Sequence, residues 1–402
     1  MNYVVTAVFM GCVFAVLLTY CAYPLGLLIV TKARRGRVAR SPDMLGEKLP
    51  TVTLVVSAYN EQAVIREKLE NALSLDYPAE HLEIMVISDA SEDATDEIVS
   101  SYADRGVVLC RQEPRRGKSA GLTQFVPQAR GEIVMFSDAN SIYEPDALRK
   151  LVRHFVDPHV GFAVGHQRYV EADCPSSVSE SLYWRYETWI KIQESRLGSA
   201  VCGDGAIYAI RAELFEPLKA DDINDFTLPL KIVARGYRGV FDEAAVCYEE
   251  TADDFRGEFR RKARIVNRSL RAVTRVPRVL NPFCVGRFAF QLGVHKIVRW
   301  FVPFFLLGLL LSTIWLSLSG SIVYAVFLAL QVSFYMTALL GLVPGIRRWQ
   351  PVYIASYFCA INAAAALGIV QCLFGRTVAV WNPERSPSES TLTMAGRATG
   401  TR

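Results

Sequence analysis

Two long stretches without formal charge constrain this chain most strongly. Residues Asn2 to Thr31 carry no charged side chain, and neither do residues Trp300 to Gly345. At 1.5 Å per residue the first stretch would form a helix of about 45 Å, which is long enough to span a bilayer with tilt. The second stretch is too long for one span and is divided near Ser317 to Ser321, which predicts two helices. The chain is therefore expected to be a membrane protein.

Basic residues indicate how the first span is oriented. They follow the apolar stretch rather than precede it, at Lys32, Arg34, Arg35, Arg37 and Arg40. A cleaved signal peptide would carry its basic residues in front. The positive-inside rule therefore predicts an N-terminal transmembrane helix over residues 1–31, a basic cytosolic linker over 32–49, and a middle region that lies in the cytoplasm. The expected location is the cell (inner) membrane, with several passes.

A third apolar segment, Val352 to Gly375, is also long enough to cross a membrane. Residues Ile361 to Leu367 are rich in alanine and the charge bias around the segment is slight, so a re-entrant or interfacial path stays open. The prediction is an amphipathic interface segment over 279–299, a membrane region of about three helices over 300–375, and a tail over 376–402.

The middle of the chain alternates short β-branched runs with helical segments, which indicates one α/β domain over residues 50–278. The predicted strands are Val52 to Ser57, Leu82 to Ser88, Val107 to Cys110, Ile133 to Ser137 and, later, Val240 to Tyr248. The predicted helices are Glu61 to Leu75, Asp93 to Tyr102, Ser119 to Ala129, Val178 to Leu197 and Asp225 to Ala234, followed by a basic helix. Helices of this length between strands predict right-handed crossovers and a mostly parallel sheet.

An acid and an amide follow the apolar run Ile133 to Phe136, at Asp138 and Asn140. A carboxylate and an amide oxygen two positions apart can share a hard divalent cation, which usually also holds a phosphate-bearing ligand. The alternative is a strand that simply ends in turn-forming residues. Two other predicted strands end on polar residues, at Ser57 and at Ser88. Because the carboxyl ends of parallel strands share one edge of a sheet, we expect the three ends to converge on one ligand.

Together with Arg115, Arg116, Gly117 and Lys118, these strand ends closely resemble the membrane-bound family 2 glycosyltransferases, the cellulose-synthase-like enzymes of GT-A fold that include the chitin-oligosaccharide and hyaluronan synthases. The resemblance spans roughly Thr51 to Ala272 and the flanking membrane helices. It implies a nucleotide-sugar site formed by Ser57, Tyr59, Glu61, Asp89, Arg115, Lys118, Asp138, Arg261 and Arg264. It also implies that Asp138 and Asn140 bind Mg²⁺ or Mn²⁺. A solvated basic turn is the alternative for residues 115–118.

Asp225 matches the catalytic acid of this family, because Asn224, Asp225 and Phe226 are followed by a glycine-tyrosine turn at Gly236. The resemblance implies that Asp225 is the general base of an inverting transfer. Such a transfer needs a carboxylate that takes the proton of the acceptor hydroxyl. The leaving diphosphate needs no general acid when cations neutralise it. Asp221 and Asp222 are competing candidates, and a helix N-cap is the alternative role of Asp225.

The basic helix places Arg261 and Arg264 one turn apart, so both can reach one diphosphate. Processive relatives carry a Q/R-x-x-R-W motif here, but this chain has Ile265 in place of the tryptophan. Isoleucine cannot provide a stacking surface for an acceptor sugar, which puts polymer-forming activity in doubt. The remaining arginines, from Arg268 to Arg278, are candidates for contact with anionic lipid.

Two features concern the acceptor. Gly203, Asp204 and Gly205 form a polar turn at the position of the acceptor-side loop in the resembling family. One predicted helix also carries four aromatic residues, Tyr183, Trp184, Tyr186 and Trp189. These rings could stack on sugar faces or pack in the core of the domain, and both alternatives stay open.

The sequence thus predicts an inverting glycosyltransferase that moves a hexose or N-acetylhexosamine from a nucleoside diphosphate sugar, with a UDP-sugar expected, to a lipid-linked or growing polysaccharide acceptor. The expected partners are donor, acceptor and membrane lipids, without nucleic acid. A processive synthase that secretes polysaccharide through its membrane helices is the first alternative. A catalytically inert nucleotide-sugar-binding scaffold is the second, because the neutral Asn140 should bind a cation more weakly than a carboxylate.

Overall fold

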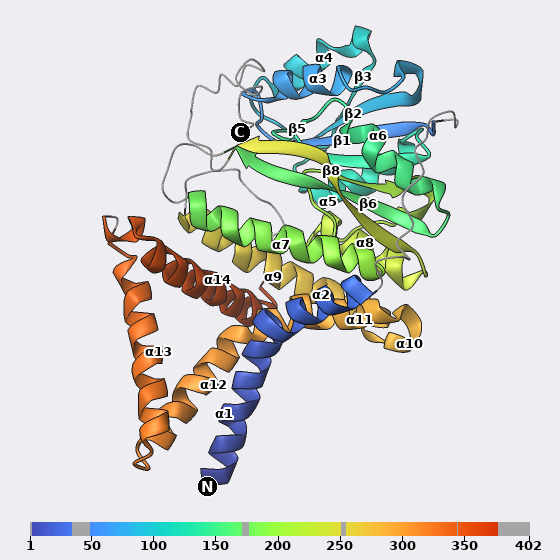
Figure 1. Cartoon of the computed structure of the whole chain (residues 1–402). Coiled ribbons are helices and arrows are strands. Elements are labelled where there is room, and N and C mark those ends of the chain that lie inside the picture. The colour runs from blue at the N-terminus through green and yellow to red at the C-terminus, as the bar shows by residue number, and fades with distance from the viewer. Residues whose placement is uncertain (1, 34–48, 171–176, 251–254, 344, 377–402) are drawn as a thin grey trace, which may run out of the picture.

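A computed structural model of the chain describes residues 2–33, 49–170, 177–250, 255–343 and 345–376. The four predicted early strands form the parallel part of an eight-stranded sheet (Figure 1). They are β1 (Val52–Ala58), β2 (Leu82–Ser88), β3 (Val107–Arg111) and β4 (Ile133–Asp138), in the order β3-β2-β1-β4. Each ends within one residue of its predicted end. The crossover helices are α3 (Ile65–Leu73), α4 (Thr95–Ser100) and α5 (Lys118–Phe125), which are shorter than predicted because turns replace their ends.

The sheet continues with four strands in the order β7-β6-β8-β5. They are β7 (Tyr208–Arg211), β6 (Val160–Val170), β8 (Arg238–Glu250) and β5 (Ile142–Tyr143), and helix α6 (Ala147–Val152) follows β5. Strand β7 is antiparallel to both β4 and β6, whereas β8 is parallel to β6. The sequence did not predict β6, because Gly161 and Gly165 interrupt its apolar run. A Cβ atom at Gly165 would lie 2.6 Å from the carbonyl oxygen of Ala245, so this glycine permits close packing of the strands.

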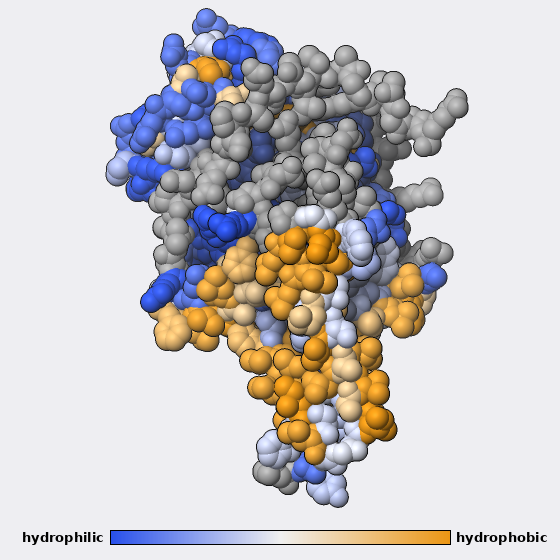
Figure 2. Space-filling view, turned by 90° about the vertical axis from the view of Figure 1, so that its left-hand side faces the viewer, coloured by the Kyte–Doolittle hydropathy of each residue, from blue (hydrophilic) through white to orange (hydrophobic). Residues whose placement is uncertain are grey.

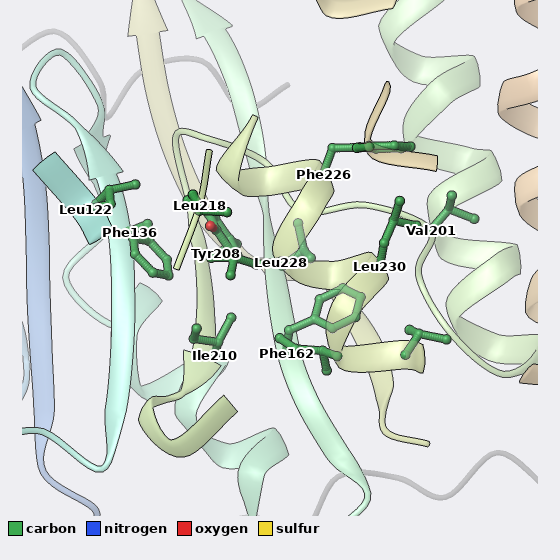
Figure 3. Packing of buried hydrophobic residues seen from close by; sticks show 14 of the residues in the cluster. Leu122, Phe136, Phe162, Val201, Tyr208, Ile210, Leu218, Phe226, Leu228 and Leu230 are labelled. Carbon is green, nitrogen blue, oxygen red and sulfur yellow. The ribbon is translucent and has the colours of Figure 1, made fainter. Parts of the chain in front are cut away.

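The hydrophobic core on one side of the sheet reaches as far as the membrane helices. Phe136 of β4 and Tyr208 of β7 stack with their ring centroids 4.7 Å apart (Figure 3). The same buried cluster includes Phe226 of α8 (Asn224–Ala234), Val266 of α9 (Phe255–Arg275) and Trp300. The domain and the membrane helices therefore share a continuous apolar interior.

Four helical segments of the described residues are long and apolar enough to cross a membrane. One is the N-terminal segment, formed by α1 (Asn2–Leu17), η1 (Leu18–Ala22) and α2 (Tyr23–Ala33). The second segment begins at Arg287 and ends with α12 (Arg299–Ser317). The third is α13 (Ile322–Leu340) and the fourth is α14 (Gln350–Leu373). Hydrophobic residues gather on the lower part of the molecule, whereas the coloured residues of the upper part are mainly hydrophilic (Figure 2). The predicted division of residues 300–345 into two helices is confirmed.

Two membrane elements differ from the prediction. The N-terminal helix is bent rather than straight, because a π-helical turn precedes Pro24, which cannot donate a backbone hydrogen bond. The predicted interface segment 279–299 contains η7 (Pro277–Leu280), α10 (Pro282–Val285), α11 (Arg287–Gln291) and η8 (Leu292–Val298). From Arg287 onward it is continuous with α12 in one apolar segment. The predicted linker and tail lie largely outside the described residues.

Helix α14 packs directly on α9 of the sheet-containing domain. A Cβ atom at Gly368 would lie 2.4 Å from the carbonyl oxygen of Ala263 and 3.1 Å from the side chain of Val266. Only glycine permits such close approach of the two helices. Helix α7 (Ser177–Leu197) lies beside α9 beneath the sheet (Figure 1). The basic helix is therefore held between the sheet and the membrane segments.

Candidate active site

The three predicted strand ends lie together at one edge of the sheet. Strand β1 lies between β2 and β4, and Ser57 is in register with both Ile87 and Asp138. A cavity of about 400 Å³ opens at these carboxyl ends. Residues that were predicted to bind donor, metal or acceptor form much of its wall: Ser57, Tyr59, Glu61, Asp89, Lys118, Asp138, Asn140, Asp204, Gly205, Asp225, Arg261 and Arg264. Of the remaining candidates, Gly203 lines a neighbouring cavity and Arg115 lies beside Tyr59.

Asp89 organises the basic loop that follows β3. Its carboxylate accepts hydrogen bonds from the backbone N–H groups of Arg116 and Gly117, at 2.9 and 3.0 Å, and from the side chain of Gln112. Gly117 has φ +89°, a conformation that favours glycine. The Arg115 guanidinium lies 3.4 Å from the centroid of the Tyr59 ring. The loop is therefore packed on the sheet edge and is not a solvated basic turn. Contact of Asp89 with a nucleotide sugar stays a prediction.

Three charged groups meet around Gly205. Lys118 Nζ lies 2.5 Å from Asp138 Oδ1. A Cβ atom at Gly205 would lie 3.4 Å from Asp225 Oδ2, 3.5 Å from Asp138 Oδ2 and 3.9 Å from Lys118 Nζ. The absence of a side chain at residue 205 therefore leaves open the space that these three groups face.

Asp225 has the properties of a general base. The pKa of its carboxyl group is raised to about 6, chiefly because the group is buried; the charge of Lys118 lowers the pKa, and the charges of Asp204 and Asp138 raise it. Among the described residues its Oδ1 atom has no hydrogen-bond partner. It does not cap α8, because the N-cap position is Ile223 and no side chain makes a capping bond there. A carboxylate with a raised pKa and a free oxygen can accept a proton near neutral pH.

The competing carboxylates are occupied elsewhere. Arg275 pairs with Asp221 at 2.7 Å and with Asp222 at 2.6 Å. Asp222 also accepts a hydrogen bond from the backbone of Lys219. These two carboxylates hold α9 against the loop before α8, which leaves Asp225 as the candidate base.

The arginines of α9 form the positive wall of the cavity. Arg261, Arg264 and Arg268 lie on one helix face and all line it. The pKa of Arg264 is lowered to about 10, chiefly by burial and in addition by the charges of Arg268 and Arg261. Two of the arginines that are candidates for lipid contact have protein partners. Arg271 donates hydrogen bonds to Asn267 and to the carbonyl oxygen of Cys372, and Arg275 binds the two aspartates.

Sequence reasoning missed Glu249, Gln167 and Lys68. Glu249 lies near the end of β8 and lines the cavity, and burial together with the charge of Asp138 raises its pKa to about 7. The sequence pattern that marks Glu249 is the one that marks Asp138 in β4, namely a polar residue after a run of buried residues. Lys68 is fully buried in α3 and donates a hydrogen bond to the carbonyl oxygen of Ser141 at 2.5 Å. It thereby supports the turn that carries Asp138 and Asn140, and no local pattern marks it.

The residues present fit a divalent cation that is shared with a ligand. The Asp138 carboxylate raises the pKa values of both Asp225 and Glu249, so this corner carries excess negative charge that a cation would offset. Within the described part of the chain, no group of three His, Cys, Asp or Glu side chains could hold a metal by itself. A cation bound by Asp138 and Asn140 would need further oxygen ligands, such as those of a diphosphate.

The acceptor-side turn can be tested by placing a side chain at Gly203, where there is no room for one. A Cβ atom there would lie 2.9 Å from the carbonyl oxygen of Asp225 and 3.1 Å from the Tyr208 ring, neither of which can move easily. Gly203→Ala is therefore expected to displace Asp225 and lower kcat on the order of 10- to 100-fold, with donor KM nearly unchanged. Gly198→Ala is the matched control, since nothing lies within 4 Å of its Cβ position. Equal kcat for the two variants would contradict the assigned role of the turn.

Residues 53–218 match the family model described as glycosyl transferase family 2. The probable glycosyltransferase YdaM of Bacillus subtilis is 26% identical over 241 residues, and the match covers 54% of this chain and 55% of that protein. The poly-beta-1,6-N-acetyl-D-glucosamine synthase of Staphylococcus aureus is 25% identical over 241 residues, which cover 58% of each chain. The chain thus spans little more than half the length of these relatives.

A solved structure shares the fold across nearly the whole chain. The mannosyltransferase PcManGT from Pyrobaculum calidifontis, in complex with GDP-Man and Mn²⁺, matches with a TM-score of 0.71 at 24% identity. The match covers 92% of this chain and 99% of that chain, so it extends from the sheet to the apolar helices. The predicted GT-A fold, with its mostly parallel sheet and apolar helices, is confirmed.

Proposed function

We propose that the chain transfers a hexose or N-acetylhexosamine from a nucleoside diphosphate sugar, with inversion at the anomeric carbon, because residues 53–218 match the model of glycosyl transferase family 2. The donor is proposed to be a UDP-sugar. The observation that carries the proposal is the position of Asp225, whose free carboxylate oxygen lies where a negative corner and an arginine-lined wall meet in one cavity.

The chemistry follows from the charges of the wall. The acceptor hydroxyl attacks the anomeric carbon, Asp225 takes its proton, and the bond to the diphosphate breaks on the opposite side. Arg261, Arg264 and Arg268 hold the leaving diphosphate and neutralise its charge. Mg²⁺ or Mn²⁺ on Asp138 and Asn140 would supply further positive charge to that leaving group. The similar mannosyltransferase was solved in complex with Mn²⁺, which supports a divalent cation here.

The proposed setting is the cytoplasmic face of the cell membrane, with the sheet in the cytoplasm and the apolar helices in the bilayer. The acceptor is proposed to be lipid-linked or a growing polysaccharide that is presented at this face. The four apolar segments and the basic residues after the first one support this orientation.

The decisive experiment uses the purified chain and a panel of labelled sugar nucleotides, with membrane lipids added and products analysed by mass. Transfer or slow hydrolysis of one donor is expected, and Asp225→Asn should strongly reduce transfer. A product with one added sugar supports single transfer, whereas a ladder of oligomers supports the processive synthase that the name of the staphylococcal relative suggests. Donor binding without any turnover in the wild type would support the inert scaffold.

The pH dependence of activity tests the base directly. Because the pKa of Asp225 is raised to about 6, its basic form is lost as the pH falls through this value. A plot of log kcat/KM against pH is expected to rise with unit slope below about pH 6 and to level off above it. If the rate stays flat down to pH 4.5, a group with an ordinary carboxyl pKa is the base, and the assignment to Asp225 is wrong.

A further inference from the structure

A second cavity, of about 250 Å³, adjoins the donor cavity at Asp225. Asp204, Asp225 and Arg261 line both cavities. In an in-line displacement the acceptor approaches from the side opposite to the leaving group. The second cavity is therefore the place from which an acceptor hydroxyl can reach Asp225, and its lining indicates which acceptor it accommodates. This inference rests on the proposed glycosyl transfer.

The aromatic residues of α7 separate into two groups. Tyr186 and Trp189 pack against the cluster around Ile190 and the N-terminal segment, so they are core residues. Trp184 instead lines the second cavity together with Tyr169 of β6, and the two ring centroids are 5.0 Å apart with an interplanar angle of 47°. The side chain of Tyr183 lies outside the described residues.

Trp184 lines the same cavity as the position where the tryptophan of processive relatives is replaced. Ile265 lines the same cavity, and the ammonium group of the neighbouring Lys262 lies 5.0 Å from the centroid of the Trp184 ring. Helix α7 thus supplies an indole side chain to the cavity wall, whereas α9 supplies an isoleucine. The surrounding groups Gln167, Lys191 and Asp204 can bind hydroxyl groups.

We propose that Trp184 forms the stacking surface for the terminal sugar of a saccharide acceptor, in place of the tryptophan that Ile265 replaces. An aromatic face with polar groups around its edge matches a pyranose ring, which has apolar C–H faces and a rim of hydroxyl groups. The cavity is smaller than the roughly 300–1,000 Å³ of sites that enclose larger ligands, so it is suited to one terminal sugar rather than to several. The acceptor is therefore a saccharide chain end and not a protein side chain or a bare lipid.

The test compares Trp184→Ala and Trp184→Phe with Trp349→Ala in the purified full chain. Trp349 is 71% exposed and does not line the cavity. Trp349→Ala is therefore the control, because it also removes one tryptophan but leaves the cavity wall unchanged. Transfer to tetramers of glucose, N-acetylglucosamine or mannose is measured beside acceptor-free hydrolysis of the donor. Trp184→Ala is expected to raise the acceptor KM at least tenfold, equivalent to about 1.4 kcal/mol. Hydrolysis should stay within about twofold, and Trp184→Phe should keep most of the transfer.

A fluorescence titration provides a readout that is independent of activity. Binding of a tetramer is expected to change the tryptophan emission of the wild type and of Trp349→Ala, and to change that of Trp184→Phe much less, because Trp300 is then the tryptophan that remains in the cavity wall. An unchanged acceptor KM in Trp184→Ala, a parallel loss of hydrolysis, or the absence of any fluorescence response to all three tetramers would each overturn the proposal. If the wild type neither hydrolyses nor transfers any donor, the proposed glycosyl transfer fails, while the titration still decides whether Trp184 binds saccharide.

Discussion

Asp225→Asn is expected to lower glycosyl transfer by about 10²- to 10⁴-fold, the range that a general base contributes. Asparagine keeps the size and most of the packing of the side chain but cannot take a proton from the acceptor. Because Asn has no negative charge, it should not weaken binding of the donor, so donor KM is expected to change little. Steady-state kinetics with the best donor of the panel provide the measurement.

The same variant should be more stable than the wild type at neutral pH. A carboxyl group whose pKa is raised by folding binds its proton more tightly in the folded state, so stability falls as the pH rises from about 4 through about 6. Removal of this buried charge is expected to raise the melting temperature at pH 7.5 by a few degrees, and to have little effect at pH 4.5. Loss of activity together with loss of stability would indicate a structural role instead.

The control for this variant is Asp221→Asn. Arg275 binds Asp221 at 2.7 Å on the far side of the loop before α8, and Asp221 is absent from the cavity wall. Its substitution should leave kcat nearly unchanged and should not raise the melting temperature, because it removes a favourable ion pair. Equal loss of transfer in both variants would contradict the assignment of the base.

Asp138→Ala is expected to abolish metal-dependent binding of the donor. The substitution removes the one carboxylate of the Asp138 and Asn140 pair and leaves Lys118 Nζ without its partner at 2.5 Å. Loss of a charged ligand corresponds to at least about tenfold in affinity. The affinity for the donor is measured by calorimetric titration with and without Mn²⁺. In the variant, Mn²⁺ should no longer strengthen binding.

Asn140→Asp is the matched comparison, because it adds a carboxylate at the other end of the pair. It should retain metal-dependent binding and tighten it, since a second carboxylate is a stronger ligand than an amide for a hard cation. The opposite pattern, with binding retained in Asp138→Ala and lost in Asn140→Asp, would mean that these residues only form a turn. It would also favour the inert scaffold over an enzyme.

The sequence predicted the first half of the sheet well because its strands are continuous apolar runs with short polar ends. A buried parallel strand leaves that pattern wherever it occurs. The same logic placed Ser57, Asp89 and Asp138 at one edge, since parallel strands bring their carboxyl ends together. Strand β6 was missed because glycines that permit close packing also weaken the apolar pattern. The bend of the N-terminal helix was missed because charge and hydropathy do not report where a helix changes its direction.

The sequence by itself determined which residue types are available for a sugar-nucleotide site and that the chain needs a membrane, because both leave local patterns of charge and hydrophobicity. Only the tertiary structure decided which of these residues act together. Contacts between distant segments separated Asp225 from Asp221 and Asp222, turned Arg268 toward the donor cavity, added Glu249 to the wall and placed Lys68 beneath Asp138. They also placed Trp184 and Ile265 in the wall of one cavity. The reason is physical: pKa values, burial and a shared cavity arise from groups that lie far apart along the chain.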